Sequence, residues 1–437
     1  MRAPGKLYGL WAKPLLLVLS SAALVACAGS PEPSGPIELT FWHGADPPPN
    51  RVVLDKLVER FNFQHPDIRV RAIYAGQQDQ QIPKILAAVI GGSPPDLLWY
   101  NATLTGQLVK ADAVVPLDGY LQKENLLERV YPNLIPATRY RGKTWSLPFD
   151  TNNLAVFYNK KIFAKAGVQT FPTTWAEFLS LAERLTVDRN GDGRPERHGL
   201  RLPLGKGEWT VFNWLPFFWQ AGGELLVGGQ PQIDSPAGVR ALTYWQSLLV
   251  RSAASLSQPE QGYMFDDFFA GRVAMQVSGP WTLGEIGENG MDYGVFPLPR
   301  GEVRATAIGG EQLFLMKTTP KREQAGWHFA RYILSAEFQS AWATGTGYLP
   351  VTPEATRTPA YQTFLQRNPQ LKIFLDQLPS GRNRPLDPTY PQISDAIGRA
   401  VEQVLLGART PTAALNAAQR EAALIVRTQP GDIDTGP

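Results

Sequence analysis

The stretch that decides the fold is residues 37–100, which opens with IELTFWHG (residues 37–44) and closes with PPDLLWY (residues 94–100). Apolar and polar residues alternate from Ile37 to Phe41, as they do in a half-buried strand. Four further runs follow in the order helix, strand, helix, strand: 53–61, 68–74, 82–89 and 97–100. Strands that alternate with helices predict an α/β fold in which helices cover a parallel sheet. Such sheets bind ligands beyond the carboxyl ends of their strands.

A turn-rich passage at residues 146–153 leads into a second unit. An apolar strand at 154–158 follows it. Thr174 begins a capping box and Ser235 precedes a proline, so each residue is expected to open a helix. A long helix is expected from about Arg322 to Trp342. A chain of 437 residues is long enough for two domains, and we therefore predict two α/β lobes.

The N-terminal segment has a basic start and a short apolar run at residues 15–25. This is the layout of a secretion signal, because the run is too short to span a bilayer comfortably. Leu24-Val25-Ala26-Cys27 resembles a bacterial lipobox, which implies a signal peptide over 1–26 and acylation of Cys27. Residues 27–36 are rich in Pro, Gly and Ser and predict a flexible tether. An ordinary signal peptide with an incidental cysteine, or an uncleaved anchor, is the alternative.

The composition gives no case for nucleic-acid binding. The formal net charge is +3, and the expected signal peptide carries three basic residues and no acidic one, so the mature chain is neutral (+3 − 3 = 0). No dense run of Lys or Arg is present. The single cysteine leaves none for an intrachain disulfide. Twelve Trp, 14 Tyr and 20 Phe are enough to fill a core and still supply a ligand surface.

An ordered set of motifs resembles a known family. After the lipobox come LTFWHG, GSPPDLLWY, SLPFDTNNLAVFYNKKIFAKAG, FPTTWAEF, AMQVSGPW and GYLPVT. This set resembles the extracellular solute-binding proteins of bacterial ABC importers, in the maltose-binding-like group, and the resemblance covers nearly all of the mature chain. It implies a two-lobed periplasmic-binding-protein fold of type II, with a ligand cleft between the lobes. Such proteins close around the ligand by hinge motion.

The resemblance also implies boundaries and partners. Lobe 1 would comprise 37–150 plus 304–346 and lobe 2 would comprise 151–303 plus 347–430, followed by a loose tail at 431–437. The partners would be a small-molecule ligand, the ABC permease subunits and the membrane, which the lipid anchor would reach. We expect a monomer on the extracytoplasmic side, with no cofactor, no metal and no nucleic acid.

The ligand class is left open between two kinds of solute. FWHG and the Gly-Tyr-Leu-Pro-Val stretch are most similar to the binders of sn-glycerol-3-phosphate and glycerophosphodiesters, whereas sugar binders share much of the pattern. The predicted ligand is therefore a sugar or a polyol phosphate, with an oligosaccharide-specific binder as the alternative.

Three residues are the main candidates for ligand contact. Asp96 matches a place where family members present a carboxylate to ligand hydroxyls, although an Asp before a strand also serves as a local cap. Trp281, after Val-Ser-Gly-Pro, resembles the family tryptophan that stacks on the ligand. Trp209 is a second stacking candidate in the Gly-rich loop 205–208. Core packing is the alternative for both rings.

Six further residues are candidates for ligand contact. Gly309 and Gly310 should bring backbone N–H groups close to the ligand, because glycine permits tight approach. Trp42, His43, Tyr74 and Asn152 could also reach the cleft. A structural, hydrogen-bonded histidine is the alternative for His43.

The phosphate assignment depends on an arginine. In the polyol-phosphate members, an Arg ahead of a Pro-Gln-Ile stretch joins the tyrosine that corresponds to Tyr348 in holding the phosphate. Here the spacing back from Pro391-Gln392-Ile393 to Arg384 or Arg382 is longer. A guanidinium would suit a phosphate bidentately, but either Arg could instead be solvated.

Two other functions, Ca²⁺ binding and catalysis, are each suggested by part of a motif. Residues 188–193 resemble the start of an EF-hand loop, but Gly199 stands where the bidentate Glu is needed, so a plain turn is favoured over a Ca²⁺ site. A secreted glycan-active enzyme would need a carboxylate pair such as Asp266-Asp267 or Asp150. No nucleophile elbow, zinc motif or phosphate loop is present, and we therefore predict a binding protein rather than an enzyme.

Overall fold

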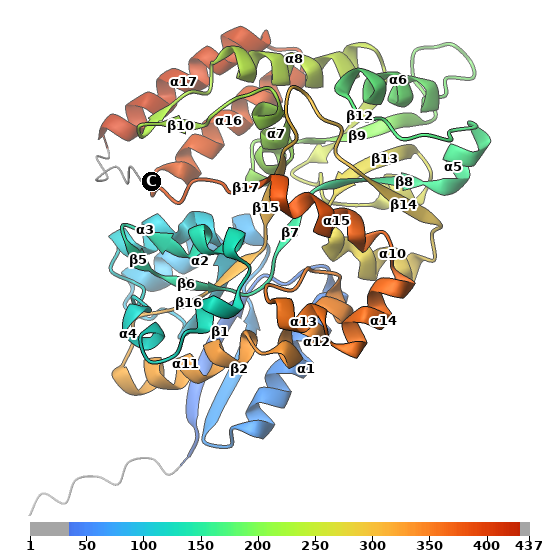
Figure 1. The fold of residues 1–437 in the computed structure, drawn as a ribbon. Helices are drawn as coiled ribbons and strands as arrows, with labels where there is room; N and C mark the ends of the chain where they lie inside the picture. Colours follow the sequence, from blue (N-terminus) through green and yellow to red (C-terminus); the bar gives the residue numbers. More distant parts are fainter. Residues whose placement is uncertain (1–34, 429–437) are drawn as a thin grey trace, which may run out of the picture. The chain divides into compact units, whose positions relative to one another are not determined.

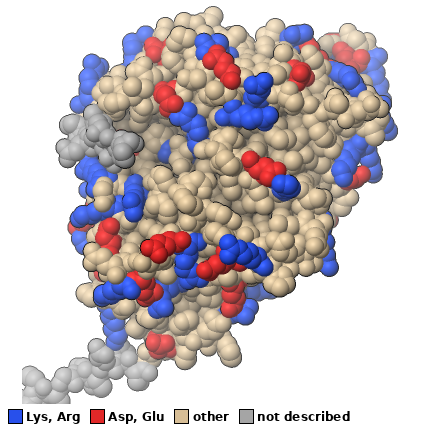
Figure 2. Space-filling view, viewed as in Figure 1, with Lys and Arg blue, Asp and Glu red and all other residues tan. Residues whose placement is uncertain are grey.

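A computed structural model describes residues 35–428 of the chain. The predicted signal peptide, Cys27 and the tail at 431–437 lie outside this range. Within it, no helix combines the length and the apolar character that crossing a membrane requires. Basic and acidic side chains are intermixed on the face that Figure 2 shows.

The first sheet has five strands in the order β2-β1-β3-β16-β6 (Figure 1). Its strands are β1 (Ile37–His43), β2 (Ile68–Tyr74), β3 (Leu97–Asn101), β16 (Glu311–Leu315) and β6 (Ser146–Pro148). β1, β2 and β3 are parallel, whereas β16 pairs antiparallel with both β3 and β6. The predicted parallel strand–helix–strand unit is therefore confirmed. Later parts of the chain add the antiparallel β16 and then β6, which runs in the same direction as β3.

The apolar run of β3 packs on both faces of this sheet. Leu97 and Trp99 join one buried cluster, with α1 (Pro48–Gln64) and α11 (Pro320–Ile333). Leu98 and Tyr100 join another, with α2 (Gln78–Ile90). Successive side chains of a strand point to opposite faces, so a strand that is covered on both sides reads as continuously apolar.

The second sheet has the order β12-β9-β13-β8-β14. Its strands are β8 (Ala155–Asn159), β9 (His198–Leu204), β12 (Ala254–Pro259), β13 (Val273–Ser278) and β14 (Tyr293–Pro297). The largest core cluster lies here and unites this sheet with Ile162 and Phe163 of the short helix that follows β8 and with five longer helices. These helices are α6 (Trp175–Leu185), α7 (Glu208–Gln220), α8 (Pro236–Val250), α16 (Tyr390–Leu405) and α17 (Pro411–Thr428).

Two short strands carry the chain between the sheets (Figure 1). β7 (Asn152–Asn153) follows β6, and β15 (Thr306–Gly309) leads into β16. They pair antiparallel with each other, and β17 (Gly381–Arg382) adds to β15. An isolated bridge joins Thr151 to Leu349. Several passages of the chain are thus hydrogen-bonded side by side where it moves from one sheet to the other; the exact lobe boundaries stay a prediction.

The remaining elements are short. The helices are α3 (Thr105–Lys110), α4 (Asp118–Leu121), α5 (Lys160–Lys165), α9 (Asp266–Phe269), α10 (Leu283–Asn289), α13 (Pro353–Thr356), α14 (Pro359–Arg367) and α15 (Leu371–Gln377), and the strands are β4 (Arg139–Tyr140), β5 (Lys143–Thr144), β10 (Leu226–Val227) and β11 (Gln230–Pro231).

Helix starts were predicted better than helix lengths. The capping box at Thr174 and Glu177 is present, and Ser235 caps α8. The single helix from Arg322 to Trp342 is wrong. It is two helices, α11 and α12 (Ala336–Thr346), because the Ser335 side chain accepts the Phe338 N–H and begins a new helix.

Candidate ligand-binding site

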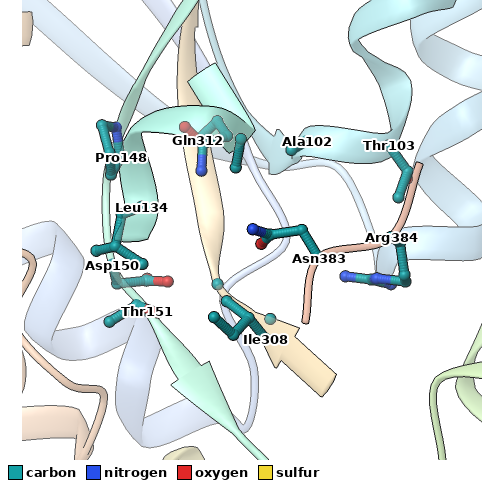
Figure 3. Close-up of a pocket in the computed structure, with 13 residues that line it drawn as sticks. Ala102, Thr103, Leu134, Pro148, Asp150, Thr151, Ile308, Gln312, Asn383 and Arg384 are labelled. Atoms are coloured by element: carbon teal, nitrogen blue, oxygen red, sulfur yellow. The ribbon is translucent and has the colours of Figure 1, made fainter. Parts of the chain in front are cut away.

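A pocket lies where the chain crosses between the two sheets (Figure 3). Its walls come from the segment after β3, the two crossings, the segment before β4 and the segment after β17. Thirteen residues line it: Ala102, Thr103, Leu134, Ala137, Pro148, Asp150, Thr151, Ile308, Gly309, Gly310, Gln312, Asn383 and Arg384. Asp150 is the only carboxylate among them and Arg384 the only cation.

The two predicted glycines line this pocket because the crossings approach each other closely. Gly310 has φ +97°, and a Cβ there would lie 2.5 Å from the Asp150 carbonyl oxygen. A Cβ on Gly309 would lie 2.2 Å from Asn152 Oδ1. Asn152 itself is buried beside the pocket, in β7, and its Oδ1 has no hydrogen-bond partner. Glycine is required at Gly310, where φ is positive and the close atoms are backbone, whereas a side chain at Gly309 would have to displace the Asn152 amide.

Asp150 is fixed by donors from the first sheet and from α12. It is 1% exposed, and its carboxylate accepts the Glu311 N–H at 2.9 Å and the Trp342 indole N–H at 3.0 Å. Burial raises the pKa of Asp150, while these hydrogen bonds act in the opposite direction. The sequence singled out Asp150 only as a possible catalytic acid, but its place is that of a polar group in the pocket wall.

Of the two arginines that the sequence left open, Arg384 is the one at the pocket. Its guanidinium carbon lies 4.6 Å from the centroid of the Phe212 ring, and its Nη1 is 2.7 Å from Glu208 Oε1. Arg382 instead pairs with Glu224 at 2.5 Å. Figure 3 shows Arg384 and Asp150 on opposite sides of the pocket.

Three aromatic residues, here called the aromatic cluster, form a series of ring contacts beside the pocket. The ring of Trp281 lies 6.0 Å from that of Trp209 and 6.2 Å from that of Tyr348. The Tyr348 ring lies 5.6 Å from that of Trp342, which donates to Asp150. Trp209 and Trp281 are half-buried, whereas Tyr348 is buried. The sequence suggested a loop at Trp209, but this residue stands in the first turn of α7.

Trp281 is placed by Gly279, two residues before it. A Cβ on Gly279 would lie 1.8 Å from the Trp281 ring, so only glycine lets the indole fold back over the chain. Trp281 packs against the main core cluster of each sheet. Among the described residues it is the only partly buried apolar side chain to border both clusters. This ring therefore lies between the two units.

His43 and Tyr74 end neighbouring strands at the carboxyl edge of the first sheet. His43 is 2% exposed, and its Nδ1 accepts the Ala45 N–H at 3.3 Å. Burial, and then the nearby Arg51 guanidinium, lower the pKa of His43 to about 4. Tyr74 is partly exposed, with the Arg51 guanidinium 3.6 Å over its ring. Trp42 faces the other side of the sheet and packs in the cluster that contains α2.

Asp96 does not lie at this edge. It precedes β3, so it lies at the amino end of that strand. Its side chain is 1% exposed, accepts the Thr40 N–H at 2.7 Å, and pairs with Arg322 at 2.5 Å. The structure thus corrects the prediction of ligand contact for Asp96, because these partners give the carboxylate a role in holding α11 against β1.

The EF-hand-like loop forms a set of local turns. The Asp188 carboxylate accepts the N–H groups of Gly191 and Gly193 at 2.8 and 2.9 Å. Within the described part of the chain, no group of three or more His, Cys, Asp or Glu side chains is arranged to hold a metal ion.

The family model of the bacterial extracellular solute-binding proteins matches residues 56–372. The chain belongs to this family. It is 25% identical over 431 residues to the sn-glycerol-3-phosphate-binding periplasmic protein UgpB of Shigella dysenteriae, an alignment that covers 93% of this chain and 96% of the relative.

Solved structures of solute-binding proteins share the fold. An ABC transporter solute-binding protein of Thermotoga lettingae bound with α-D-tagatose has a TM-score of 0.79 and 26% identity, and the match covers 89% of this chain and all of that one. UgpB of Mycobacterium tuberculosis in complex with glycerophosphocholine has a TM-score of 0.80 and 23% identity, over 91% of this chain and all of that one.

These matches confirm three predictions from the sequence: the two-lobed periplasmic-binding-protein fold, membership of the solute-binding proteins of ABC importers, and a binding protein rather than an enzyme. As a member of an extracellular family, this solute-binding protein works outside the cytoplasm.

Sequence reasoning missed several residues of the pocket. Thr103, Gln312 and Asn383 stand in no recognisable motif, and they meet only because three distant segments cross here. Glu208 carried one signal, its place beside the predicted stacking residue Trp209. Its partner, Arg384, is 176 residues away in sequence.

Proposed function

We propose that this protein captures a neutral sugar or short oligosaccharide and delivers it to the permease of an ABC importer. The observation that carries the proposal is the aromatic cluster beside a pocket of mixed polar lining. Half-buried indole rings offer flat apolar faces to the C–H face of a sugar. Pockets of this kind fix orientation with a small number of polar groups.

The polar lining suits hydroxyl groups. A sugar hydroxyl both donates and accepts hydrogen bonds. Asp150 supplies an acceptor, and the amides of Gln312 and Asn383 supply donors and acceptors. Arg384, already paired with Glu208, adds donors and no uncompensated charge. This balance supports an uncharged solute.

A polyol phosphate, sn-glycerol-3-phosphate or a glycerophosphodiester, is the second candidate. One observation favours it: Arg384 lines the pocket, and an arginine suits phosphate oxygens well. The relatives named UgpB bind such ligands. In this chain, however, the phosphate would have to compete with the Glu208 carboxylate for the same guanidinium.

A thermal-shift and calorimetry panel tests the proposal. The probes are maltose, maltotriose and D-tagatose against sn-glycerol-3-phosphate and glycerophosphocholine. A ligand present at one hundred times its Kd should stabilise the protein by about 2.7 kcal/mol. We expect the largest shift from a neutral sugar, which mass spectrometry should recover unchanged. A shift from the phosphate compounds alone would contradict the proposal.

Ligand capture should close the two units over the pocket. The paired crossings at Asn152 and Gly309 are the hinge that we infer, because the chain passes from one sheet to the other along both of them. A bound solute would favour the closed form by binding it more tightly. X-ray scattering with and without the best sugar should show a smaller radius of gyration for the complex. The molecular mass from the same measurement should be that of a monomer in both cases.

We also infer that Cys27 is acylated and that 1–26 is removed. The lipobox and the Pro/Gly/Ser tether support this anchor. Wild-type protein should sediment with membranes and label with a fatty-acid analogue. Cys27→Ser should remain soluble outside the cytoplasm and unlabelled, and membrane retention of that variant would contradict the inference.

A further inference from the structure

We propose that Glu208 is a specificity-determining residue, which neutralises Arg384 so that the pocket accepts uncharged solutes and rejects phosphorylated ones. The inference rests on the proposed function and names the feature that would decide between its two ligand classes. It assigns a role in selection to a carboxylate that does not line the pocket.

Glu208 is held firmly by three partners. Its Oε1 accepts Arg384 Nη1 at 2.7 Å and the Tyr390 hydroxyl at 2.9 Å. Its Oε2 accepts the Ser394 hydroxyl. Glu208 is also the first residue of α7, where the helix dipole favours a negative charge. The carboxylate therefore cannot leave Arg384 without breaking bonds to two residues of α16.

Arg384 is a buried cation whose charge is already balanced. The Arg384 side chain is 7% exposed and that of Glu208 is 17% exposed. Burial alone would lower the pKa of Arg384, but Glu208, Tyr390 and Glu311 raise it, so the guanidinium stays charged. A buried charge requires such a partner. The pair presents N–H donors to the pocket with no net charge.

An anionic ligand would meet this pair differently from a neutral one. A phosphate placed on Arg384 would lie beside the Glu208 carboxylate and would face Asp150 across the pocket. Like charges in a site shielded from water repel strongly. A sugar hydroxyl could accept from a remaining guanidinium N–H without that repulsion. Building repulsion against one ligand class is a general way to reach specificity.

Removal of the Glu208 charge should therefore open the pocket to phosphates. Glu208→Gln keeps the size of the side chain and an oxygen that can accept from Arg384 and Tyr390. We expect the ratio of sn-glycerol-3-phosphate affinity to maltotriose affinity, measured by calorimetry, to rise at least tenfold. The gained binding should persist at moderate salt, because a contact between opposite charges is screened little where the cation is buried.

Two further variants make the result specific. Glu224→Gln is the matched control, because it removes the carboxylate that pairs with Arg382. Arg382 is two residues from Arg384 in sequence but does not line the pocket. Glu224→Gln should leave the affinity ratio unchanged. Glu208→Gln with Arg384→Gln removes both charges and should lose the gained phosphate binding. If the single variant is poorly folded, folding of the double variant would show that the unpaired Arg384 charge is the cause, as the neutralising role of Glu208 requires, whereas failure of both variants to fold would contradict that role.

The outcomes separate this inference from the proposed function. If wild-type protein binds maltotriose or another sugar of the panel, and Glu208→Gln gains no affinity for glycerol-3-phosphate, the inference alone is wrong. If no sugar binds, and Glu208→Gln gains phosphate binding, the sugar proposal alone is wrong. Tight binding of glycerol-3-phosphate by wild-type protein would overturn both.

Discussion

His43 should make this protein sensitive to acid in a measurable way. The pKa of His43 is about 4 in the folded protein, against an ordinary value of 6.5. Between these two values the unfolded chain binds a proton that the folded chain does not. The free energy of unfolding therefore falls as the pH is lowered through this window. The stability that the neutral His43 ring contributes is fully present above pH 6.5.

The size of the effect follows from the gap between the two pKa values. The gap is about 2.5 pH units, and each unit corresponds to about 1.36 kcal/mol. Lowering the pH from 7 to 4 should thus reduce the free energy of unfolding by about 3 kcal/mol through His43 alone. The physical cause is burial of the imidazole first and the Arg51 guanidinium second, both of which oppose a positive charge on the ring.

His43→Asn isolates this effect. The shorter amide keeps an oxygen near the position of Nδ1, where it can still accept the Ala45 N–H. At pH 7 the variant should be less stable than wild type, because it leaves a small cavity. Urea unfolding from pH 7 to pH 4 should show the difference between the two proteins shrinking by about 3 kcal/mol, since the variant has no ring to protonate.

A neighbouring variant excludes a trivial explanation. Phe41→Leu, at a fully buried ring 5.9 Å from His43, also leaves a cavity but removes no titratable group. Its stability difference from wild type should stay constant across the same pH range. A constant difference for His43→Asn as well would refute the argument that burial holds this ring neutral.

Three other variants test the site. Trp281→Ala should weaken the best sugar at least tenfold in calorimetry, because it removes the ring between the two cores; unchanged affinity would remove Trp281 from the site. Asp96→Ala should keep its ligand affinity but lower the free energy of unfolding in urea by about 2 kcal/mol, because Arg322 and Thr40 lose an acceptor. If this variant instead lost ligand binding and kept full stability, the sequence prediction of ligand contact would be right. Gly310→Ala should lower the free energy of unfolding by about 1–3 kcal/mol, because φ there is +97°, and equal stability would show that the crossing can relax.

Local pattern predicted much of the fold. The alternation in β1, the capping box at Thr174 and the apolar run of β3 each depend on neighbours in sequence, and each is present in the structure. The break between α11 and α12 also has a local cause, because Ser335 is a favoured N-cap residue, but the apolar spacing on both sides of it predicted one continuous helix.

The site was harder to predict because its geometry depends on distant segments. Asp96 precedes a strand and follows two prolines, which fitted a ligand contact, but its partner Arg322 is 226 residues away. Arg384 and Arg382 look alike in sequence, and only their partners Glu208 and Glu224 place one at the pocket and the other outside it. No local pattern encodes such pairs.

The position of β16 in the first sheet bears on how this protein is exported. This strand, Glu311–Leu315, pairs with both β3 and β6, so the sheet lacks an internal member until 315 of the 437 residues have been made. Until then β3 has an unpaired edge on the side that β16 will occupy, so the first sheet of the nascent chain stays incomplete during most of its synthesis. Late completion of a sheet suits a chain that crosses a membrane before it folds.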